Sequence, residues 1–407
     1  MPRNVSWAAL ATAALLGTTC FTTGALAADP IKLGVSGPFT GGSASMGVSM
    51  REGVKLAVEE INKAGGVLGR QIVTVERDDE AKNEVGVQVT QELINKEHVV
   101  ATVGFINTGV TLAATRFYQE AQIPVFDNVA TGSAVTKQFL PPDYENNYVF
   151  RNSANDSIQA AMIVDQAIDK QHFAKPAIMA DSTNYGQLGR QDLVAALAKK
   201  NIKPVTEEKF NIGDVDMTAQ LLKAKAAGAD SILTYGIGPE LAQIANGMSK
   251  LGWKVPIVGS WTLSMSTFID NAGPNGEGAI MPETFIQAPT TPKRKAFIEA
   301  YQKDTGLDRI PSPVSAAQGY DSVYLLVAAI KQAGTTDGPK VRAALEDLKE
   351  KVDGVVTTYD HPYSAADHEA ISRNIPVFGV VKGGRVTFWS KEDEASAGEV
   401  RVKGAVN

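Results

Sequence analysis

The stretch IKLGVSGPFTGGSASMGVSMREGVKLAVEEINKAGG, residues 31–66, shows how the chain is built. IKLGVS is a short apolar run typical of a buried strand, and a glycine-rich loop follows it. The spacing i, i+3, i+4, i+7 then predicts a helix with one apolar face over residues 49–62, from Val54, Ala57, Val58 and Ile61. Gly65-Gly66 ends that helix, as glycine commonly does. The stretch is therefore a strand–loop–helix unit.

The same unit repeats along the chain. Strands are predicted at residues 31–36, 72–76, 99–103, 123–126, 148–151, 177–180, 205–210, 231–235 and 256–258. Helices are predicted at residues 49–62, 83–96, 111–121, 157–169, 185–199, 217–226, 239–251, 293–305, 314–333 and 341–348, and a hairpin at 377–389. Apolar strands alternating with amphipathic helices predict an α/β fold with parallel sheets covered on both faces. The pattern restarts near Tyr148, which indicates two such units.

The first 27 residues are typical of a secretory signal peptide. Arg3 precedes an apolar run that is too short to span a bilayer, and Ala25-Leu26-Ala27 matches an A-x-A cleavage site. The only cysteine, Cys20, lies in this segment, and a lipoprotein anchor is disfavoured because no aliphatic residue stands in Gly17-Thr18-Thr19. Cleavage near Ala27 leaves 407 − 27 = 380 residues without cysteine. We therefore expect an exported chain without disulfides.

Composition and motifs argue against several classes of function. The formal charge is −6, and the absence of a long basic block argues against nucleic acid and anionic membranes as partners. No later apolar run is long enough to insert into a membrane. The sequence has no G-x-S-x-G elbow, and it has no glycine pattern of a nucleotide site. Structural or surface roles are expected for the four histidines, His98, His172, His361 and His368. We expect no catalytic residues, no metal and no cofactor.

Two loops of small polar residues follow neighbouring predicted strands. Residues 105–109 (FINTG) follow one strand and open a helix, and residues 128–133 (NVATGS) follow the next strand. Ligands of open parallel sheets lie beyond the carboxyl ends of the strands, so these loops are candidates for a cleft. Each loop can offer backbone N–H groups and a hydroxyl, which suits a carboxylate. Thr108 and Thr131 could equally be helix N-caps, and the loops alone leave both interpretations open.

The sequence resembles a known family over essentially all of its mature length. The resemblance is carried by IKLGVSGPFTGGSASMG, REGVKLAVEEINKAGGVLGRQI, TVGFINTGVT, IPVFDNVAT, YVFRNSAND, NYGQLGR and AAQGYDSVYLL, in this order and spacing. These segments are similar to those of the periplasmic solute-binding proteins of ABC importers, in the type I branch with the leucine/isoleucine/valine-binding proteins. The resemblance implies two Rossmann-like lobes, joined by three crossovers, with the ligand between them.

The family fold implies where the lobes should begin and end. The crossovers should fall near residues 148–151, 280–283 and 355–358. Lobe 1 should comprise residues 28–148 and about 281–355, and lobe 2 residues 149–280 and about 356–407. Residues 1–27 are the signal peptide. The resemblance also implies a periplasmic location, ABC permease subunits as partners and a monomer.

Family ligand contacts can be transferred by motif. The carboxylate-holding hydroxyl falls on Thr108, beside Phe105 and Asn107 in the same loop. The contacts of the second loop fall on Val129, Ala130 and Thr131. The second-lobe contacts fall on Tyr185, on Ile237 or, with a shift of the loop, on Tyr235, and the first-lobe position that is often aromatic falls on Met46.

One position departs from the family pattern. Amino-acid binders place an acidic residue after the strand-end glycine to pair with the ligand's ammonium group, whereas here Trp261 stands in IVGSWTL. A buried ammonium without a partner charge is costly. The favoured ligand is therefore an aromatic or aliphatic organic acid. The alternative is a branched-chain or other amino acid bound through Glu240, Asp181 or water.

Three classes of function can be compared at this point. A periplasmic solute-binding subunit is the leading hypothesis, and a periplasmic ligand sensor of the same fold is an alternative. An enzyme is disfavoured by the absence of a catalytic constellation, and a transcriptional regulator by export and the lack of a DNA-binding segment.

Overall fold

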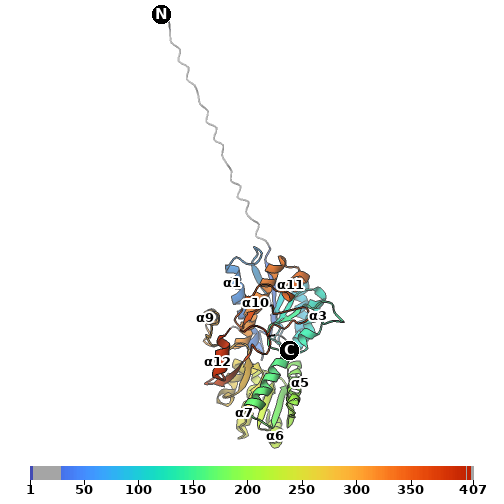
Figure 1. Ribbon diagram of the computed structural model, residues 1–407, viewed down its shortest axis with the longest axis vertical. Helices are drawn as coiled ribbons and strands as arrows, with labels where there is room; N and C mark the ends of the chain where they lie inside the picture. Colours follow the sequence, from blue (N-terminus) through green and yellow to red (C-terminus); the bar gives the residue numbers. More distant parts are fainter. Residues whose placement is uncertain (3–28, 400, 405–407) are drawn as a thin grey trace.

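The computed structural model describes residues 1–2, 29–399 and 401–404. The predicted cleavage site near Ala27 and Cys20 lie outside the described residues, as does nearly all of the predicted signal peptide. Figure 1 shows two lobes: blue, teal and orange segments share the upper one, and green and yellow segments share the lower one. Each lobe is built around its own sheet.

The first lobe contains a five-stranded, all-parallel sheet. The strand order is β2-β1-β3-β4-β5. The strands are β1 (Ile31–Gly37), β2 (Ile72–Asp78), β3 (Ala101–Gly104), β4 (Val125–Asp127) and β5 (Val149–Arg151). All residues of β3, β4 and β5 are buried, as expected for parallel strands covered on both faces.

Two pairs of helices cover this sheet. The α1 helix packs against α10, and α2 packs against α3. The helices of this lobe are α1 (Ala44–Lys63), α2 (Asn83–Asn95), α3 (Thr108–Ala121), α10 (Pro313–Ala333) and α11 (Gly338–Glu346). Contact between α1 and α10 is close because α1 has Gly53 there: an ideal Cβ on Gly53 would lie 2.0 Å from the carbonyl oxygen of Ala316. A short 3₁₀ helix, η1 (Val135–Lys137), follows the loop after β4.

The second lobe contains a seven-stranded mixed sheet. The order is β14-β13-β10-β9-β8-β6-β7, with parallel pairing from β10 to β7 and antiparallel pairing of β13 with β10 and β14. Its strands are β6 (Pro176–Asp181), β7 (Thr206–Phe210), β8 (Ser231–Tyr235), β9 (Ile257–Gly259), β10 (Ile280–Glu283), β13 (Val377–Lys382) and β14 (Arg385–Phe388). The predicted hairpin at residues 377–389 is therefore present as β13 and β14.

Helices flank this second sheet as well. They are α4 (Asp156–Val164), α5 (Asn184–Lys199), α6 (Thr218–Ala226), α7 (Gly238–Lys250), α8 (Ser266–Ala272) and α12 (Lys391–Gly398). Shorter 3₁₀ helices are η3 (Trp261–Ser264) and η4 (Gly273–Gly276). A further helix, α9 (Pro292–Thr305), contacts α1 of the first lobe. The small ladder of β11 (Val352–Asp353) and β12 (Thr358–Tyr359) follows α11.

The chain passes between the two sheets three times. It leaves the first sheet after β5, returns after β10 to form α10, and leaves again between β12 and β13. Two of these segments run side by side, because Arg151 N–H donates to His368 O at 2.9 Å and Ala370 N–H donates to Arg151 O at 2.8 Å. The connecting segments therefore form a common hinge region. The exact residue limits of the two domains remain a prediction.

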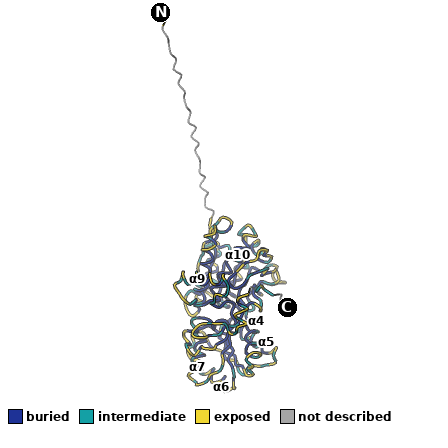
Figure 2. Tube along the Cα trace, turned by 60° about the vertical axis from the view of Figure 1, so that its left-hand side comes forward, coloured by how far each residue is buried: buried dark blue, intermediate teal, exposed yellow. Residues whose placement is uncertain are grey.

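The largest hydrophobic cluster runs through both lobes. It includes Val35 and Phe126 in the first sheet and Leu233 and Val258 in the second. Figure 2 shows this buried interior continuing along the middle of the molecule, with exposed residues at loops and helix surfaces. The two lobes are thus packed against each other in this structure.

Some elements differ from the sequence prediction. The first helix begins at Ala44 rather than residue 49, and α3 begins at Thr108 rather than residue 111. The helix predicted over residues 157–169 is α4 followed by a π-helical segment, η2 (Asp165–Lys170). Among the described residues, no helix is long and apolar enough to cross a membrane.

Candidate functional site

The two polar loops identified in the sequence lie together at one edge of the first sheet. They follow β3 and β4, which are adjacent parallel strands. Three hydrogen bonds join them: Asn128 N–H donates to Gly104 O at 3.0 Å, Ala130 N–H to Phe105 O at 3.1 Å, and Gly132 N–H to Thr108 Oγ1 at 3.3 Å. The loops therefore form one surface at the start of α3.

Phe105 has the backbone conformation that brings the first loop into place. Its φ angle is +63°, a left-handed conformation that is uncommon for a residue with a bulky side chain and that often occurs at functional sites. The side chain points into the core of the first lobe, where its ring meets Tyr118 edge-on at 6.1 Å. The structure therefore places Phe105 behind the loop, as support, and does not bring its ring to the other candidate contacts.

The hydroxyl groups of Thr108 and Thr131 differ in the hydrogen bonds that they make within the protein. Thr108 Oγ1 accepts the Gly132 N–H, so its own proton is free to be donated. Thr131 Oγ1 is buried and has no hydrogen-bond partner among the described residues. Asn107 is the N-cap residue of α3, yet its side chain makes no cap bond and donates to Ser43 Oγ at 3.2 Å. Neither threonine acts as a simple helix N-cap, because α3 begins at Thr108 itself and the helix nearest after Thr131 begins with Val135.

The opposing wall comes from strand-end loops of the second lobe. Tyr185 lies in the first turn of α5, Ile237 is the N-cap of α7, and Trp261 opens η3 after β9. All three are buried in the cluster that also contains Met46 and Val129 of the first lobe. Residues from both lobes that the sequence analysis selected are therefore brought together.

The two tyrosines of this wall are fixed by hydrogen bonds. The Tyr185 hydroxyl donates to Ser260 Oγ at 2.6 Å, and the Tyr235 hydroxyl donates to the Asp156 carbonyl oxygen at 3.3 Å. Their rings meet edge-on at 5.4 Å. Tyr235 and Ile237 are both buried, and the choice between these two alternative contacts stays a prediction.

The facing edges of the two lobes are in contact. An ideal Cβ on Gly109 at the start of α3 would lie 3.0 Å from Asn184 Oδ1 at the start of α5. A cavity of about 10 Å³ remains next to Trp261, which is roughly the space for one water molecule. Its lining includes Thr131, Gln159 and Trp261 from the cleft and Thr284 and Gln318 from the hinge side. The structure is thus a closed form with a narrow internal space between the lobes.

Comparisons with known proteins agree with this architecture. The family model described as "Periplasmic binding protein" matches residues 30–385, most of the chain. The chain belongs to the periplasmic binding protein family. The leucine-, isoleucine-, valine-, threonine-, and alanine-binding protein of Pseudomonas aeruginosa is 29% identical over 327 residues, covering 80% of this chain and 84% of that protein. The relatives place this binding protein in the type I, Leu/Ile/Val-binding branch.

Solved structures show the same fold as this binding protein. A type 1 periplasmic binding protein from Bordetella pertussis Tohama I has a TM-score of 0.79 and 28% identity, covering 88% of this chain and 99% of that one. The branched-chain amino acid transporter substrate binding protein LivJ from Streptococcus pneumoniae, in complex with isoleucine, has a TM-score of 0.76 and 27% identity, covering 88% and 97%. The α/β fold with two lobes predicted from the sequence is confirmed.

Hydrogen bonds to neighbouring side chains hold the backbone of Trp261 in place in this binding protein. Its backbone N–H donates to Gln159 Oε1 at 3.1 Å, and its carbonyl accepts the Ser264 hydroxyl at 2.8 Å. Its indole Nε1 is buried and has no hydrogen-bond partner among the described residues. The indole therefore presents an apolar face and one unused donor beside the internal space.

The two acids that the sequence analysis named as alternatives each use one carboxyl oxygen to hold a loop, whereas Glu240 Oε2 and Asp181 Oδ2 are buried without a hydrogen-bond partner among the described residues. Glu240 Oε1 accepts the Gly213 N–H at 2.7 Å, and Asp181 Oδ1 accepts the N–H and hydroxyl of Thr183 at 2.9 and 2.5 Å. Each holds a loop of the second lobe in place.

A third acid, Asp156, was missed by sequence reasoning. It opens α4, its side chain is fully buried, and neither carboxyl oxygen has a hydrogen-bond partner among the described residues. Burial raises its pKa to about 7, although the nearby Thr131 hydroxyl lowers that pKa. The only signal in the sequence was the position of Asp156 at the start of a helix, in NSANDS (residues 152–157). An acidic residue there more often stabilises the helix end than binds a ligand.

The remaining titratable candidates lie outside the site. His98, His172 and His361 occupy turn positions with positive φ, and His368 is buried with Nδ1 2.9 Å from Val149 O and its ring stacked on Phe150. Among the described residues, no group of three or more His, Cys, Asp or Glu side chains is arranged to hold a metal ion.

Proposed function

We propose that this protein captures a small carboxylate between its two lobes and presents the closed form to the membrane permease of an ABC importer. It is a periplasmic binding protein of the branched-chain amino acid transporter type, a family of solute-binding proteins found in the periplasm. The observation that carries the ligand proposal is the joined surface of the two loops, in which the Gly132 N–H bonds to Thr108 Oγ1 at the start of α3 and the hydroxyl of the preceding residue, Thr131, has no partner among the described residues.

The carboxylate end of the ligand fits this surface. The first N–H groups of α3 have no partner within the helix, and the helix dipole favours negative charge there. The Thr108 proton is free to be donated, because its oxygen already accepts the Gly132 N–H. Asn107, Val129 and Ala130 complete the loop surface around these donors.

The body of the ligand would lie against the wall of the second lobe. Tyr185, Ile237 and Trp261 supply an apolar surface, and Met46 of the first lobe belongs to the same buried cluster. A small-molecule pocket generally has a volume of about 300–1,000 Å³. The internal space of about 10 Å³ is far smaller. A ligand therefore fits only when the lobes lie farther apart than in this structure, both during entry and while it is bound.

The favoured ligand is an aromatic or aliphatic organic acid. Trp261 stands where an acid would pair with an ammonium group, and the two neighbouring acids, Glu240 and Asp181, already hold backbone groups of their own lobe. A flat indole face suits an aromatic or branched apolar body. Its unused Nε1–H could donate to a hydroxyl or carbonyl on such a ligand.

One observation favours a second candidate, an amino acid. Asp156 is a buried carboxyl without a hydrogen-bond partner among the described residues, and its charge raises the pKa values of Tyr185 and Tyr235. Such a carboxylate could pair with an ammonium group from the ligand. The relative from Pseudomonas aeruginosa is described as binding leucine, isoleucine, valine, threonine and alanine.

Direct binding measurements decide between these candidates. The mature protein is stripped of ligand by unfolding and refolding, and then titrated calorimetrically with benzoate, 3-methylbutanoate and L-leucine. Leucine and 3-methylbutanoate share the branched apolar body and differ in the ammonium group. Tight binding of an acid without an ammonium group supports the favoured ligand class. Tight binding of leucine with no detectable binding of either acid overturns it.

The partner and the mode of action need separate tests. A solute-binding subunit binds ligand stoichiometrically without converting it, so the recovered ligand should be chemically unchanged. Capture of permease subunits from solubilised membranes by the ligand-bound protein supports transport, whereas capture of a sensor-kinase ectodomain supports the sensor alternative. The monomeric state is checked by light scattering.

A further inference from the structure

A fully buried arginine lies directly behind the loop that we propose binds the carboxylate. Arg151 ends β5, and its side chain has no solvent exposure. Its Nη1 donates to the carbonyl oxygen of Gly132 at 2.8 Å and to that of Ala130 at 3.4 Å. One guanidinium therefore holds two carbonyl groups of the same loop.

These two bonds, together with one from the Ser153 hydroxyl to the Ala130 carbonyl at 3.1 Å, fix the direction in which the loop's N–H groups point. In a planar trans peptide, the C=O and the following N–H point in opposite directions. With the Ala130 and Gly132 carbonyls turned towards Arg151, the N–H groups of Thr131 and Ser133 are turned away from it. Neither N–H is hydrogen-bonded within the part of the chain that the structure describes. Arg151 thus leaves two backbone donors available to a ligand anion.

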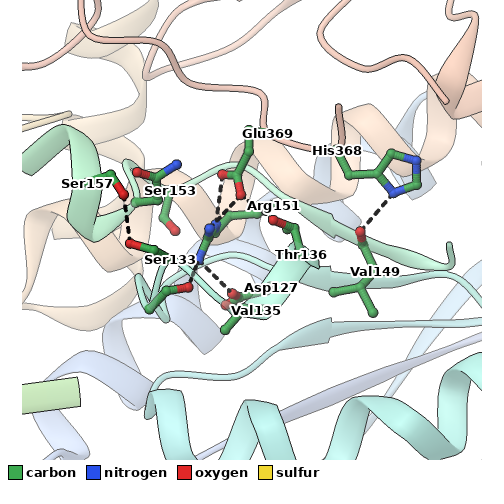
Figure 3. A network of polar contacts seen from close by, with 12 residues as sticks. Asp127, Ser133, Val135, Thr136, Val149, Arg151, Ser153, Ser157, His368 and Glu369 are labelled. Carbon is green, nitrogen blue, oxygen red and sulfur yellow. Dashed lines mark hydrogen bonds and ion pairs between the residues drawn. The ribbon is translucent and has the colours of Figure 1, made fainter. Parts of the chain in front are cut away.

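The other side of the guanidinium is fixed by Glu369. The Nε and Nη2 groups donate to Glu369 Oε2 and Oε1 at 2.8 and 2.5 Å, a bidentate pair that is geometrically specific (Figure 3). Glu369 also accepts the hydroxyl of Thr136, just beyond the loop. Because Glu369 lies in the last crossover segment, beside β5, the loop is connected to two of the three hinge segments.

The charges around Arg151 indicate that it acts by holding the loop in position and not by attracting the ligand's negative charge. Burial lowers the pKa of Arg151, but its interactions with the Glu369, Asp127 and Asp156 carboxyl groups together outweigh this effect and raise the pKa overall. The guanidinium charge is therefore already compensated. Asp127 Oδ2 lies 3.8 Å from Nη1, yet burial raises the pKa of Asp127 well above its ordinary value. A long-range attraction of Arg151 for the ligand anion is consequently weak.

We propose that Arg151 is a positioning residue for ligand recognition, held by Glu369, that orients the 128–133 loop so that the Thr131 and Ser133 N–H groups face the ligand carboxylate. This inference rests on the proposed function of that loop. Replacement by lysine keeps a positive charge but cannot reproduce the fork that holds both carbonyls and both carboxylate oxygens.

A discrimination measurement tests this role. The affinities of wild type and Arg151→Lys are measured by calorimetry for benzoate and benzamide, and for L-leucine and L-leucinamide. Each amide keeps the body of its acid and removes the carboxylate charge. We expect Arg151→Lys to lower the acid-to-amide affinity ratio roughly tenfold, the effect of losing one charge-assisted hydrogen bond.

Arg294 offers a matched control. It is also a buried arginine, and its guanidinium donates to the carbonyls of Val355, Val356 and Ala397, away from the cleft loops. Arg294→Lys should lower the melting temperature but keep the wild-type acid-to-amide ratio. If Arg151→Lys does not fold, Glu369→Gln replaces it, and a lower ratio is again expected.

The outcomes separate this inference from the proposed function. If wild type binds neither benzoate nor leucine, the proposed function fails and the role of Arg151 fails with it. If wild type binds one acid and the position 151 or 369 variant keeps the wild-type ratio, only the positioning role is overturned. A lower ratio in the Arg294 variant as well would also overturn it, since general destabilisation would then be the cause.

Discussion

The backbone N–H of Gly132 donates a hydrogen bond to Oγ1 of Thr108 over 3.3 Å, so the loops after β3 and β4 act as one unit. This bond also sets the direction of the threonine hydroxyl. Because the oxygen accepts from Gly132, the proton is directed to a different acceptor. The first prediction concerns that proton.

Thr108→Val should weaken binding of the carboxylate ligand by about 1.5–3 kcal/mol, the contribution of a hydrogen bond to a charged group. The substitution keeps the size of the side chain and removes the hydroxyl. Thr108→Ser keeps the hydroxyl and serves as the control. Calorimetric titration gives both affinities, and an unchanged affinity in the valine variant would exclude Thr108 as a carboxylate contact.

Gly132→Ala should destabilise the protein and weaken ligand binding. An ideal Cβ at this position would lie 2.3 Å from Cγ2 of Thr108, so the loops must separate. Overpacking of this kind typically costs about 1–3 kcal/mol. The double variant Gly132→Ala/Thr108→Ser removes the clashing methyl group and should recover most of the loss. Urea unfolding of the four proteins measures the coupling, and additive effects would contradict the close approach.

Asp156 should make the unfolding free energy depend on pH. Its folded-state pKa is raised from 3.8 to about 7 by burial, so the folded state binds the proton more tightly than the unfolded state. The contribution is favourable at low pH and is lost progressively as pH rises from about 4 to about 7. Asp156→Asn should therefore stabilise the protein more at pH 8 than at pH 5. Urea unfolding at both pH values measures this difference, and equal effects would contradict the raised pKa.

The same residue gives opposite pH trends for the two ligand classes. An ammonium group beside Asp156 favours the ionised carboxylate, so the affinity of an amino acid should increase as pH rises through about 7. An organic anion favours the protonated form, so its affinity should decrease over the same range. Titrations at pH 6 and pH 8 distinguish the trends. Asp156→Asn should remove the pH dependence of the affinity for either ligand class. A pH dependence that persists in that variant would come from another titratable group.

Ligand binding should change the fluorescence of Trp261. Its indole lies beside the internal space between the lobes, whereas Trp253 lies in the loop that precedes β9, at the opposite end of that strand. The ligand-induced change should be lost in Trp261→Phe and kept in Trp253→Phe. Retention of the full signal in Trp261→Phe would show that the ligand does not reach this side chain.

Much of the fold could be predicted from periodicity, but some element boundaries could not. The two sheets could be predicted from apolar strands alternating with amphipathic helices. Parallel strands that are buried on both faces appear in the sequence as short, continuous apolar runs. The start of α1 at Ala44 was missed, since its first turn contains serine and glycine, which are weak helix formers. This turn instead packs closely against the preceding loop: an ideal Cβ on Gly47 would lie 2.0 Å from Pro38 O. Such tertiary contacts override local propensity.

The candidate site was predictable only where its residues follow strand ends. Thr108 and Thr131 could be selected because adjacent parallel strands end at one edge of a sheet. The core position of Phe105 could not be predicted, because the direction of its side chain depends on a left-handed backbone angle. The role of Arg151 depends on Glu369, 369 − 151 = 218 positions away, and a pairing at that separation leaves no local pattern.

The contact between α1 and α10 has a consequence for the order of folding. Gly53 and Ala316 touch, although 316 − 53 = 263 positions separate them, so the first sheet lacks one of its covering helices until the chain has been made through Ala333. The apolar surface that α10 covers stays exposed to water until then, which costs free energy. Most of the polypeptide must therefore be synthesised before the amino-terminal lobe can complete its packing.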